Sequence, residues 1–501
     1  MIERTAMTDR KTSRDTEKLG RTQAGSLCRA FGPKGPALRR IRSKGDALMD
    51  YQREYRRKLV SAAEAAGLVQ SGMWIDYGFG CGQPRLIDEE LARRAPELER
   101  VKIREMLNLV DLQTVHADPR QEHFIHNSWF FSQVARRNHE MRSCSFIPDN
   151  FGGHPRNYRG RLREMALVDM AFIEVTPMDK HGYFNFGGAC STEKAVCDAA
   201  RTVVVEVNES QPWVYGGYDE TIHISEVDYI VENDRHPIAE LPVPPQTEID
   251  ERIAAHVVEE IQDGATIQLG IGAMPNAICR LLTERRTGDL GIHTEMFTEG
   301  MMDLIEAGAI TNAKKSLHKD KAVFTFAFGS RRLYDFIDRN ARLAIFPVDY
   351  TNNPYVIAQN HRQVAVNSCL KVDLKGQVCS ESSGFRQISG TGGQLDFTRG
   401  AYMSPGGKAF LCLKATRETK EGIIESNIRT ALEPGDTVTT PRSEVHYIAT
   451  EFGAVNLKGM SSWQTAKLLI SIAHPDFRGE LEEAALRVNL ITPATLREPS
   501  R

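Results

Sequence analysis

Two kinds of hydrophobic pattern alternate along most of the chain. Short, nearly continuous apolar runs at 168–175 and 202–207 are rich in β-branched residues, which is typical of strands buried on both faces of a parallel sheet. Segments with apolar residues at helical spacing lie between such runs, as at 51–67 and 193–201, and Gly67 can end the first of them. This alternation predicts an α/β fold.

The alternation starts again in the second half of the chain. Helices and strands are predicted in turn at 248–262, 265–270, 274–282, 290–296, 300–309, 322–328, 331–338 and 342–348. Residues 232–248 contain four prolines and many polar residues, which is typical of a linker between domains. We therefore predict an N-terminal α/β domain at 49–235, a linker at 236–248 and a C-terminal α/β domain at 249–501.

Residues 1–48 have a different composition from the rest of the chain. The first 45 residues hold twelve Lys and Arg against four Asp and Glu, with few large apolar residues and no apolar segment like that of a secretory signal. We expect a disordered basic arm, or a start assigned too far upstream. A transit peptide is the alternative, and the four acidic residues count against it.

Composition and charge exclude several classes of protein. Apolar residues make up 41% of the 501 residues and charged residues 26%, as in an ordinary globular protein. The net charge of -3 argues against a chain built mainly to bind nucleic acid, and no apolar run is long enough to predict a membrane span. The nine cysteines form no C-x-x-C pair, which favours free thiols in the cytoplasm over disulfides or a zinc site.

The segment GIGAMPNAI at 270–278 links a predicted strand to a predicted helix. Pro275 suits the first turn of a helix, and the free backbone N–H groups of such a turn attract anions. A phosphate-bearing ligand is therefore one interpretation, and an ordinary strand–helix turn is the other. Pro275 occupies the third glycine position of a G-x-G-x-x-G fingerprint, and no Walker lysine is present, so a Rossmann dehydrogenase is disfavoured.

Glu295 falls at the carboxyl end of the predicted strand 290–296, where open α/β sheets usually bind ligands. A carboxylate there can attack an activated acyl group, although a partly exposed structural glutamate is the alternative. Glu299 is a second candidate, but an acid at its position suits the first turn of the following helix. For His293 and the aromatic segment 126–131, packing is favoured over roles as a base or a ligand box.

Two further segments combine glycines with polar residues. The segment SGFRQISGTGGQLDF at 383–397 carries a cluster of four glycines, Gly384, Gly390, Gly392 and Gly393. Such a loop can present consecutive backbone N–H groups to an oxyanion, and a flexible or tightly turned loop is the alternative. Glu451 lies between a predicted strand and a glycine turn, where a solvated loop acid is equally consistent with the pattern.

Six motifs in a fixed order resemble the acetyl-CoA hydrolase/transferase family, the class I CoA-transferases. The closest branch is that of the 4-hydroxybutyrate and butyryl-CoA:acetate CoA-transferases, and the resemblance spans residues 50–485. The motifs are MDKHGYFNFG at 178–187, GIGAMPNAI at 270–278, HTEM at 293–296, DYTNNPYVI at 349–357, SGTGGQLDF at 389–397 and TEFGAVNLKG at 450–459. Each motif alone is weak, whereas six in order are specific.

The resemblance implies a fold and a set of site residues. The fold is two similar CoA-transferase-type α/β domains with the active site in the cleft between them. Glu295 is implied as the nucleophile of an H-[ST]-E-M segment, here with Thr294. Asn353 and Glu451 are implied near the acyl site. The implied CoA-binding residues are Gly270, Ile271, Gly272, Ala273, Met274, Gly390, Gly392, Gly393 and Lys414.

The function implied by the resemblance is transfer of CoA between an acyl-CoA and a free carboxylate through a glutamyl-CoA thioester, with ping-pong kinetics. Acetate, butyrate and 4-hydroxybutyrate are expected substrates, CoA is both substrate and covalent intermediate, and neither a metal nor a permanently bound cofactor is expected. A homodimer or homotetramer is implied, with no nucleic-acid or membrane partner.

Three alternatives remain open at this point. A succinate or itaconate CoA-transferase would need an extra cation, for which Arg386 and Arg399 are candidates. An acyl-CoA hydrolase would use the same pocket and admit water. A nucleotide-binding regulator would keep the glycine loops without chemistry, and the intact HTEM segment speaks against it.

Overall fold

The computed structural model describes residues 50–160, 168–242 and 245–499, and these residues build two separate, mainly parallel sheets. One sheet draws its strands from residues 74–233 and the other from residues 266–456. The predicted α/β architecture with two halves is therefore confirmed, while the bounds set for the two domains stay predictions. The basic arm predicted at 1–48 lies outside the described residues.

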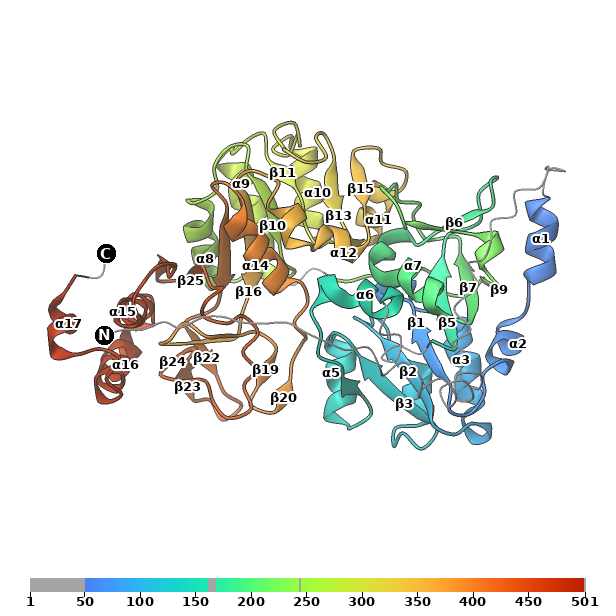
Figure 1. The fold of residues 1–501 in the computed structure, drawn as a ribbon, viewed down its shortest axis with the longest axis horizontal. Coiled ribbons are helices and arrows are strands. Elements are labelled where there is room, and N and C mark those ends of the chain that lie inside the picture. The colour runs from blue at the N-terminus through green and yellow to red at the C-terminus, as the bar shows by residue number, and fades with distance from the viewer. Residues whose placement is uncertain (1–49, 161–167, 243–244, 500–501) are drawn as a thin grey trace, which may run out of the picture. The chain divides into compact units, whose positions relative to one another are not determined.

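The first sheet has seven strands in the order β4-β3-β2-β1-β5-β7-β9, and every neighbouring pair is parallel. Its strands are β1 (Trp74–Tyr77), β2 (Val101–Glu105), β3 (Phe124–Ser128), β4 (Ser145–Phe146), β5 (Met170–Val175), β7 (Thr202–Asn208) and β9 (Tyr229–Asn233). Figure 1 shows them as adjacent blue and green arrows. The apolar runs predicted at 168–175 and 202–207 form β5, next to the central strand β1, and β7, next to the edge strand β9.

Helices cover both faces of the first sheet. Alternate residues of each strand point to opposite faces, so each strand contributes side chains to the packing on both. Met170 and Phe172 of β5 pack with residues of α2 and α3, whereas Ala171 and Ile173 pack with residues of α6 and α7. These helices are α2 (Ala62–Gly67), α3 (Leu86–Arg93), α6 (His154–Arg159) and α7 (Cys190–Ala199). Burial on both faces explains the continuous apolar character of these strands.

The second sheet has six strands in the order β11-β10-β16-β21-β25-β26, and only the last pair is antiparallel. Val364 and Val366 face the core that contains α8 and α9, and Ala365 faces α13 and α14. The strands are β10 (Thr266–Leu269), β11 (Gly291–Ile292), β16 (Gln363–Ser368), β21 (Lys408–Cys412), β25 (Tyr447–Thr450) and β26 (Gly453–Asn456). The helices are α8 (Glu248–Val258), α9 (Ala273–Glu284), α13 (Pro354–Ile357) and α14 (Gln394–Met403).

Each sheet contains a point at which the strand order reverses. From β1 the chain runs outward through β2, β3 and β4 on one side, and later through β5, β7 and β9 on the other. From β10 it runs to β11 on one side and to β16, β21 and β25 on the other. Ligands of open α/β sheets bind in the crevice at such switch points, outside the carboxyl ends of the strands.

The strands predicted at 290–296 and 322–328 are each divided in two, which corrects the prediction. The first becomes β11 and β12 (Met296–Phe297), and the second becomes β13 (Ala322–Phe324) and β14 (Phe326–Ala327). β12 pairs with β14 in a separate two-stranded sheet, so the chain leaves the main sheet between residues 293 and 295. The break keeps both pieces buried, and an apolar run therefore cannot reveal it.

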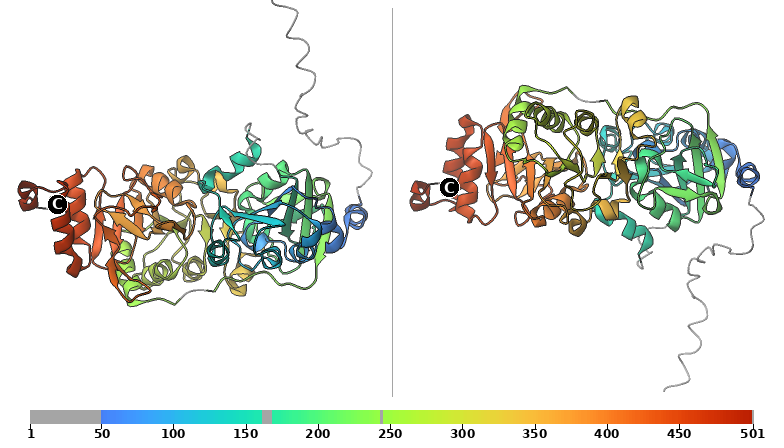
Figure 2. Two further views of the ribbon diagram at one scale, coloured as in Figure 1. Left: turned by 90° about the horizontal axis from the view of Figure 1, so that it is seen from below. Right: turned by 90° about the horizontal axis from the view of Figure 1, so that it is seen from above.

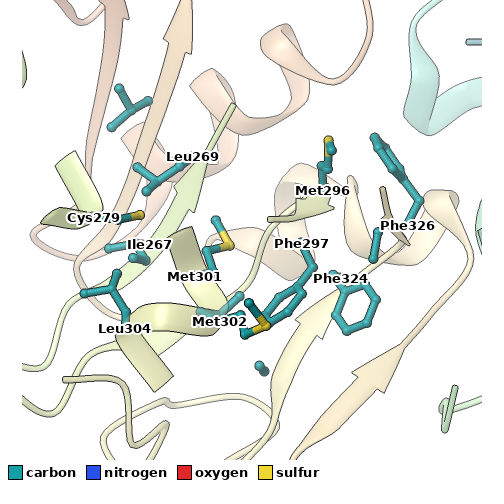
Figure 3. Packing of buried hydrophobic residues seen from close by; sticks show 14 of the residues in the cluster. Ile267, Leu269, Cys279, Met296, Phe297, Met301, Met302, Leu304, Phe324 and Phe326 are labelled. Atoms are coloured by element: carbon teal, nitrogen blue, oxygen red, sulfur yellow. The ribbon is translucent and has the colours of Figure 1, made fainter. Parts of the chain in front are cut away.

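Packing around this break fixes the short strands. Phe297 and Phe324 lie with ring centroids 5.1 Å apart, next to Met301 and Met302 of α10 (Glu299–Glu306), as Figure 3 shows. Met296 and Phe326 point to the other side of the paired strands in the same view. All four side chains are buried in the same hydrophobic cluster, so the strand pair is packed on both sides.

The helix predicted at 51–67 is also divided, into α1 (Tyr51–Lys58) and α2. Ser61 caps α2 and forms a reciprocal capping box with Glu64. Leu59 makes a bridge with Ile230 beside the first sheet. The capping box marks the start of the second helix in the sequence. The apolar residues keep a helical spacing across both helices, so that spacing alone predicts one continuous helix.

The C-terminal residues pack as helices against a small mixed sheet. A separate apolar core joins Leu374 and Val378 to Leu469 of α15 and Leu481 of α16. These helices are red in Figure 2 and comprise α15 (Ser462–Ser471), α16 (Pro475–Arg487) and α17 (Pro493–Arg497). None of the described helices has the length and apolar character needed to cross a bilayer.

The remaining elements connect these layers. They are α4 (Gln113–Ala117), α5 (Gln133–Glu140), β6 (Tyr183–Asn185), β8 (Thr221–His223), α11 (Arg331–Ile337), β15 (Leu343–Ile345), α12 (Val348–Thr351), β17 (Lys371–Asp373), β18 (Val378–Cys379), β19 (Ser382–Ser383), β20 (Arg386–Gln387), β22 (Thr416–Glu418), β23 (Ile424–Ser426) and β24 (Ile428–Arg429). All eight cysteines within the described residues are buried and free, as predicted.

Candidate active site

A cavity of about 870 Å³ lies at the carboxyl ends of strands from both sheets. Its walls include Phe79 after β1 and Leu107 after β2 from the first sheet, and Gly270 after β10 and Cys369 after β16 from the second. Both strand-order reversals therefore face the same space. Its volume falls within the roughly 300–1,000 Å³ that is usual for small-molecule sites.

Glu295 lines this cavity from the break between β11 and β12. Its backbone carbonyl accepts hydrogen bonds from the N–H groups of Thr325 and Phe326, at 3.0 and 3.2 Å. On the preceding side, Thr294 donates to the carbonyl of Val323 at 3.0 Å. The backbone of Glu295 is thus anchored to β13 and β14, which leaves its side chain directed to the cavity.

Two groups donate hydrogen bonds to the Glu295 carboxylate. The Asn352 side chain donates from Nδ2 to Oε2 at 2.6 Å, and the backbone N–H of Gly393 donates as well. Gly393 immediately precedes α14, so the positive end of that helix also faces the carboxylate. A Cβ atom on Gly393 would lie 1.9 Å from Glu295 Oε2 and 2.2 Å from Asn352 Nδ2, so only glycine fits there.

The pKa of Glu295 is raised to about 7. Burial is the main cause, and the negative charge of nearby Asp396 raises the pKa further, whereas the hydrogen bonds from Asn352 and Gly393 lower it. The carboxylate is therefore poorly solvated, held in one orientation and ionised over the neutral to alkaline range. A desolvated and oriented carboxylate of this kind can act as a nucleophile toward an activated carbonyl.

His293 is a core residue, as the packing interpretation predicted. Its side chain is fully buried, and Nε2 lies 2.8 Å from the carbonyl oxygen of Thr351. Burial lowers the pKa of His293 to about 3, so the ring stays neutral. His126 is likewise buried, and burial lowers its pKa. Phe130, from the same aromatic segment, also lines the cavity.

Glu299 occupies the first turn of α10, as predicted. Its Oε1 accepts a hydrogen bond from the backbone N–H of Ser330 at 2.9 Å. The side chain also lines the cavity, but its hydrogen-bond partner is Ser330, whereas Asn352 and Gly393 donate to Glu295. It therefore serves as a natural control for Glu295.

The two glycine segments predicted to bind a ligand meet at this cavity. Gly270, Ile271 and Gly272 line it, and so do Gly390, Gly392 and Gly393. Gly272 has φ 123° and directly precedes α9, so the start of a twelve-residue helix faces the cavity. Helix starts of this kind attract phosphate groups. Of the remaining predicted positions, Met274 is buried in the core and neither it nor Ala273 lines the cavity.

Three other predicted site residues lie away from the cavity lining. The Lys414 ammonium is 3.7 Å from Asp250 Oδ1, and Glu451 accepts a hydrogen bond from the backbone N–H of Ala415 at 2.9 Å. Asn353 caps α13 by accepting from the N–H of Tyr355 at 3.0 Å. Its neighbour Asn352 contacts Glu295 instead. The asparagine pair in DYTNNPYVI pointed to the right segment, but not to which side chain turns inward.

The two arginines suggested as partners for a second carboxylate are engaged elsewhere. Arg386 forms an ion pair with Glu140, and Arg399 lies 3.2 Å from Glu444. Neither lines the cavity. Among the described lining residues Arg136 is the one cation, and its Nε donates to the carbonyl of Ile388 at 2.8 Å. The structure therefore does not place Arg386 or Arg399 at the cavity, and a substrate with a second carboxylate stays an untested alternative.

Comparison with known proteins agrees with this arrangement. The sequence matches the acetyl-CoA hydrolase/transferase N-terminal domain over residues 44–242 and the C-terminal domain over residues 329–485. It is 46% identical to a probable butyrate:acetyl-CoA coenzyme A-transferase of Syntrophomonas wolfei, over 87% of this chain and 97% of the relative. It is 43% identical to a succinyl-CoA:cyclohexane-1-carboxylate CoA transferase of Geobacter metallireducens, over 90% and 100% of the two chains.

A solved structure shares the fold. The 4-hydroxybutyrate CoA-transferase of Porphyromonas gingivalis is 36% identical to this chain and superposes with a TM-score of 0.71. The match covers 87% of this chain and 100% of the other.

Proposed function

This chain belongs to the acetyl-CoA hydrolase/transferase family and is a CoA-transferase, and we propose that Glu295 is its covalent nucleophile. The proposed reaction moves CoA from an acyl-CoA to a free short-chain acid such as acetate or butyrate. One observation carries the proposal: a half-buried carboxylate in the cavity, held by Asn352 and Gly393, with a pKa raised to about 7.

The first half-reaction uses Glu295 twice. Its carboxylate attacks the thioester carbonyl of the acyl-CoA, the C–S bond breaks, and CoA thiolate leaves behind an acyl-glutamyl anhydride. The thiolate then attacks the glutamyl carbonyl, the anhydride C–O bond breaks, and the free carboxylate departs. The product is a glutamyl-CoA thioester. Negative charge develops on the glutamyl oxygen during the second attack, next to the Asn352 and Gly393 donors.

The second half-reaction reverses these steps with another acid. The incoming carboxylate attacks the glutamyl thioester, releases CoA thiolate and forms a new anhydride. The thiolate attacks the acyl carbonyl of that anhydride, which restores the Glu295 carboxylate and yields the new acyl-CoA. One thioester is exchanged for another, so the reaction needs no further energy source. The donor and acceptor acids use the site in turn, which is the basis of the proposed ping-pong kinetics.

The glycine segments supply the proposed CoA contacts. Gly270, Ile271 and Gly272 line the cavity at the start of α9, which suits the pyrophosphate of CoA. Gly390, Gly392 and Gly393 also line it, and the last two lie close to Glu295, which suits the thioester end. Binding of the distant nucleotide can then support the strained steps at the thioester. A homodimer or homotetramer stays a prediction.

Water is the competitor in this scheme, because it would hydrolyse both the anhydride and the glutamyl thioester. The walls beside Glu295 include the buried side chains of Phe79, Phe151, Phe326 and Phe328. Such an apolar surface disfavours ordered water and supports transfer over hydrolysis.

Incubation of the protein with acetyl-CoA and butyrate tests the proposed function. We expect butyryl-CoA and acetate to form in equal amounts, with little free CoA, and we expect no steady turnover of acetyl-CoA beyond the loading of Glu295 when butyrate is omitted. Initial rates at several concentrations of both substrates should give parallel double-reciprocal lines. Steady release of CoA without any added carboxylate would instead identify an acyl-CoA hydrolase.

The raised pKa of Glu295 predicts a pH dependence. Below about pH 7 the nucleophile is increasingly protonated, so kcat/KM for acetyl-CoA should fall about tenfold per pH unit and level off at higher pH. Replacing Asp396 with Asn removes the negative neighbour and should shift this limb to lower pH. A profile that is flat from about pH 5 to 8 would contradict the assignment of Glu295 as the titrating nucleophile.

A further inference from the structure

Asp396 is a buried carboxylate that shares a hydrogen-bond donor with the nucleophile. It is 5% exposed, and burial raises its pKa to about 6. The side chain of Asn352 donates to Asp396 as well as to Glu295, and it is completely buried. Asn352 therefore bridges the two carboxylates, so the position of Asp396 decides where the amide that holds Glu295 can lie.

The other hydrogen bonds to Asp396 come from the first half of the chain. Asn150 donates from Nδ2 to Oδ1, and the backbone N–H of Gly152 donates to Oδ2 at 3.1 Å. Asp396 lies in the first turn of α14, where an acid suits the helix dipole without any further partner. The helix alone therefore does not explain why two donors from a distant part of the sequence converge on this carboxylate.

The loop 149–153, which carries these two donors, packs closely against the segments that hold the nucleophile. Phe151 donates its backbone N–H to the carbonyl of Gly392 at 3.1 Å. A Cβ atom on Gly152 would lie 2.9 Å from Asp396 Oδ2 and 3.3 Å from Asn352 Cβ. A displacement of this loop would therefore disturb the groups that fix the nucleophilic carboxylate.

We propose that Asn150 and Asp396 are positioning residues for CoA transfer, which hold the Asn352 amide in the orientation in which it donates to Glu295. The loop 149–153 of the first half thereby completes the active site. This inference rests on the proposed function, because it assumes that Glu295 is the nucleophile. It adds a hydrogen-bonded path from the first half of the chain to the reacting carboxylate. Neither positioning residue lines the cavity, so both act through Asn352.

Asn150→Leu tests the first link of this path. The variant leaves one oxygen of the buried Asp396 carboxylate without its donor, so the carboxylate and the amide that it orients can shift. For exchange between acetyl-CoA and butyrate, kcat should fall about tenfold to a hundredfold, since a small misplacement of a reacting group has an effect of this size. KM for acetyl-CoA should stay within about threefold of the wild-type value, because the cavity lining is unchanged.

Asn157→Leu is the matched control for that variant. Asn157 is also a partly buried asparagine, and its Nδ2 donates to the carboxylate of Asp149 in the same loop rather than to Asp396. Its replacement should leave kcat within about threefold of the wild-type value. Equal losses in the two variants, or a wild-type kcat in Asn150→Leu, would overturn the inference.

A combination of Asn150→Leu with Asp396→Asn tests whether the first residue acts through the second. Once Asp396 is replaced, loss of Asn150 should lower kcat by less than about threefold, because coupled residues are not additive. Equal losses from Asn150→Leu in both backgrounds would show that Asn150 only supports the loop, and would overturn the inference.

The pH profile of Asn150→Leu gives a readout that a loosened loop alone would not change. The hydrogen bond from Asn150 lowers the pKa of Asp396, so without it Asp396 binds a proton more readily and no longer raises the pKa of Glu295. The acid limb of kcat/KM should therefore move to lower pH. Arg399, whose charge also lowers the pKa of Asp396, is kept in the variant. An acid limb at the wild-type position would overturn the inference.

The rate of CoA loading separates this inference from the proposed function. With acetyl-CoA and no acceptor acid, Asn150→Leu should load Glu295 to the wild-type extent, but about tenfold to a hundredfold more slowly, as a time course of intact mass measures. Loading at the wild-type rate overturns the inference alone, whereas a wild-type protein that takes up no CoA at Glu295 overturns both. If Asn150→Leu fails to fold, Asn150→Ala removes the same donor without adding an apolar side chain, and the same results are expected of it.

Discussion

Replacing Glu295 with Gln is expected to lower kcat/KM for CoA transfer by about 10⁴-fold or more, the scale seen when other enzymes lose a covalent nucleophile. Gln keeps the shape of the side chain and an oxygen that can accept from Asn352, but its amide cannot form the acyl anhydride. Steady-state exchange between acetyl-CoA and butyrate measures the loss. The variant should fold, since it removes a half-buried charge rather than adding one.

Glu299→Gln is the matched control for that variant. Glu299 lies four residues further along, lines the same cavity and caps a backbone N–H of Ser330. Its replacement should lower the exchange rate by less than about tenfold, because a Gln oxygen can still accept that hydrogen bond. Similar losses in the two variants, or substantial exchange by Glu295→Gln, would contradict the assignment of the nucleophile.

Gly393→Ala is expected to have the second largest effect. The new Cβ would overlap both Glu295 Oε2 and Asn352 Nδ2, at 1.9 and 2.2 Å, so the carboxylate and its donors must move apart. Loss of one oriented donor to a developing oxyanion typically lowers kcat about a hundredfold to a thousandfold. Measurement of kcat for the exchange reaction, together with the thermal unfolding midpoint, separates a displaced site from a destabilised fold.

Gly479→Ala provides the control for a glycine replacement. Gly479 lies within α16, and a Cβ there meets no atom within 4 Å. This variant should keep wild-type exchange and gain a little stability, because alanine favours helix over glycine by up to about 1 kcal/mol. If Gly393→Ala behaved in the same way, the close contact between Gly393 and Glu295 would not matter for catalysis.

The sequence predicted the layers of the fold well, because burial on both faces leaves a local pattern. The strands β5 and β7 appear directly as nearly continuous apolar runs. The breaks at residues 293–295 and at Thr325 were missed, since both sides of each break stay buried. Which sheet a short strand joins depends on partners far away in the chain, and an apolar run does not carry that information.

The sequence also placed the main segments of the site, but not every residue that acts in them. Resemblance pointed to Glu295 and to both glycine segments, which line one cavity. It pointed to Asn353 where Asn352 makes the contact, because the turn of two short helices decides which side chain faces inward.

The most direct test of the central claim is the intact mass of the protein after incubation with acetyl-CoA in the absence of an acceptor acid, with Glu295→Gln in parallel. The wild type should gain the mass of CoA less one water, and a digest should place the adduct on the peptide that contains Glu295. The adduct should resist thiol reductants, which release CoA bound to cysteine as a disulfide, and it should react with borohydride. Glu295→Gln should remain unmodified. A wild-type protein that exchanges acyl groups without any adduct, or an adduct that persists in Glu295→Gln, would contradict the glutamyl-CoA intermediate.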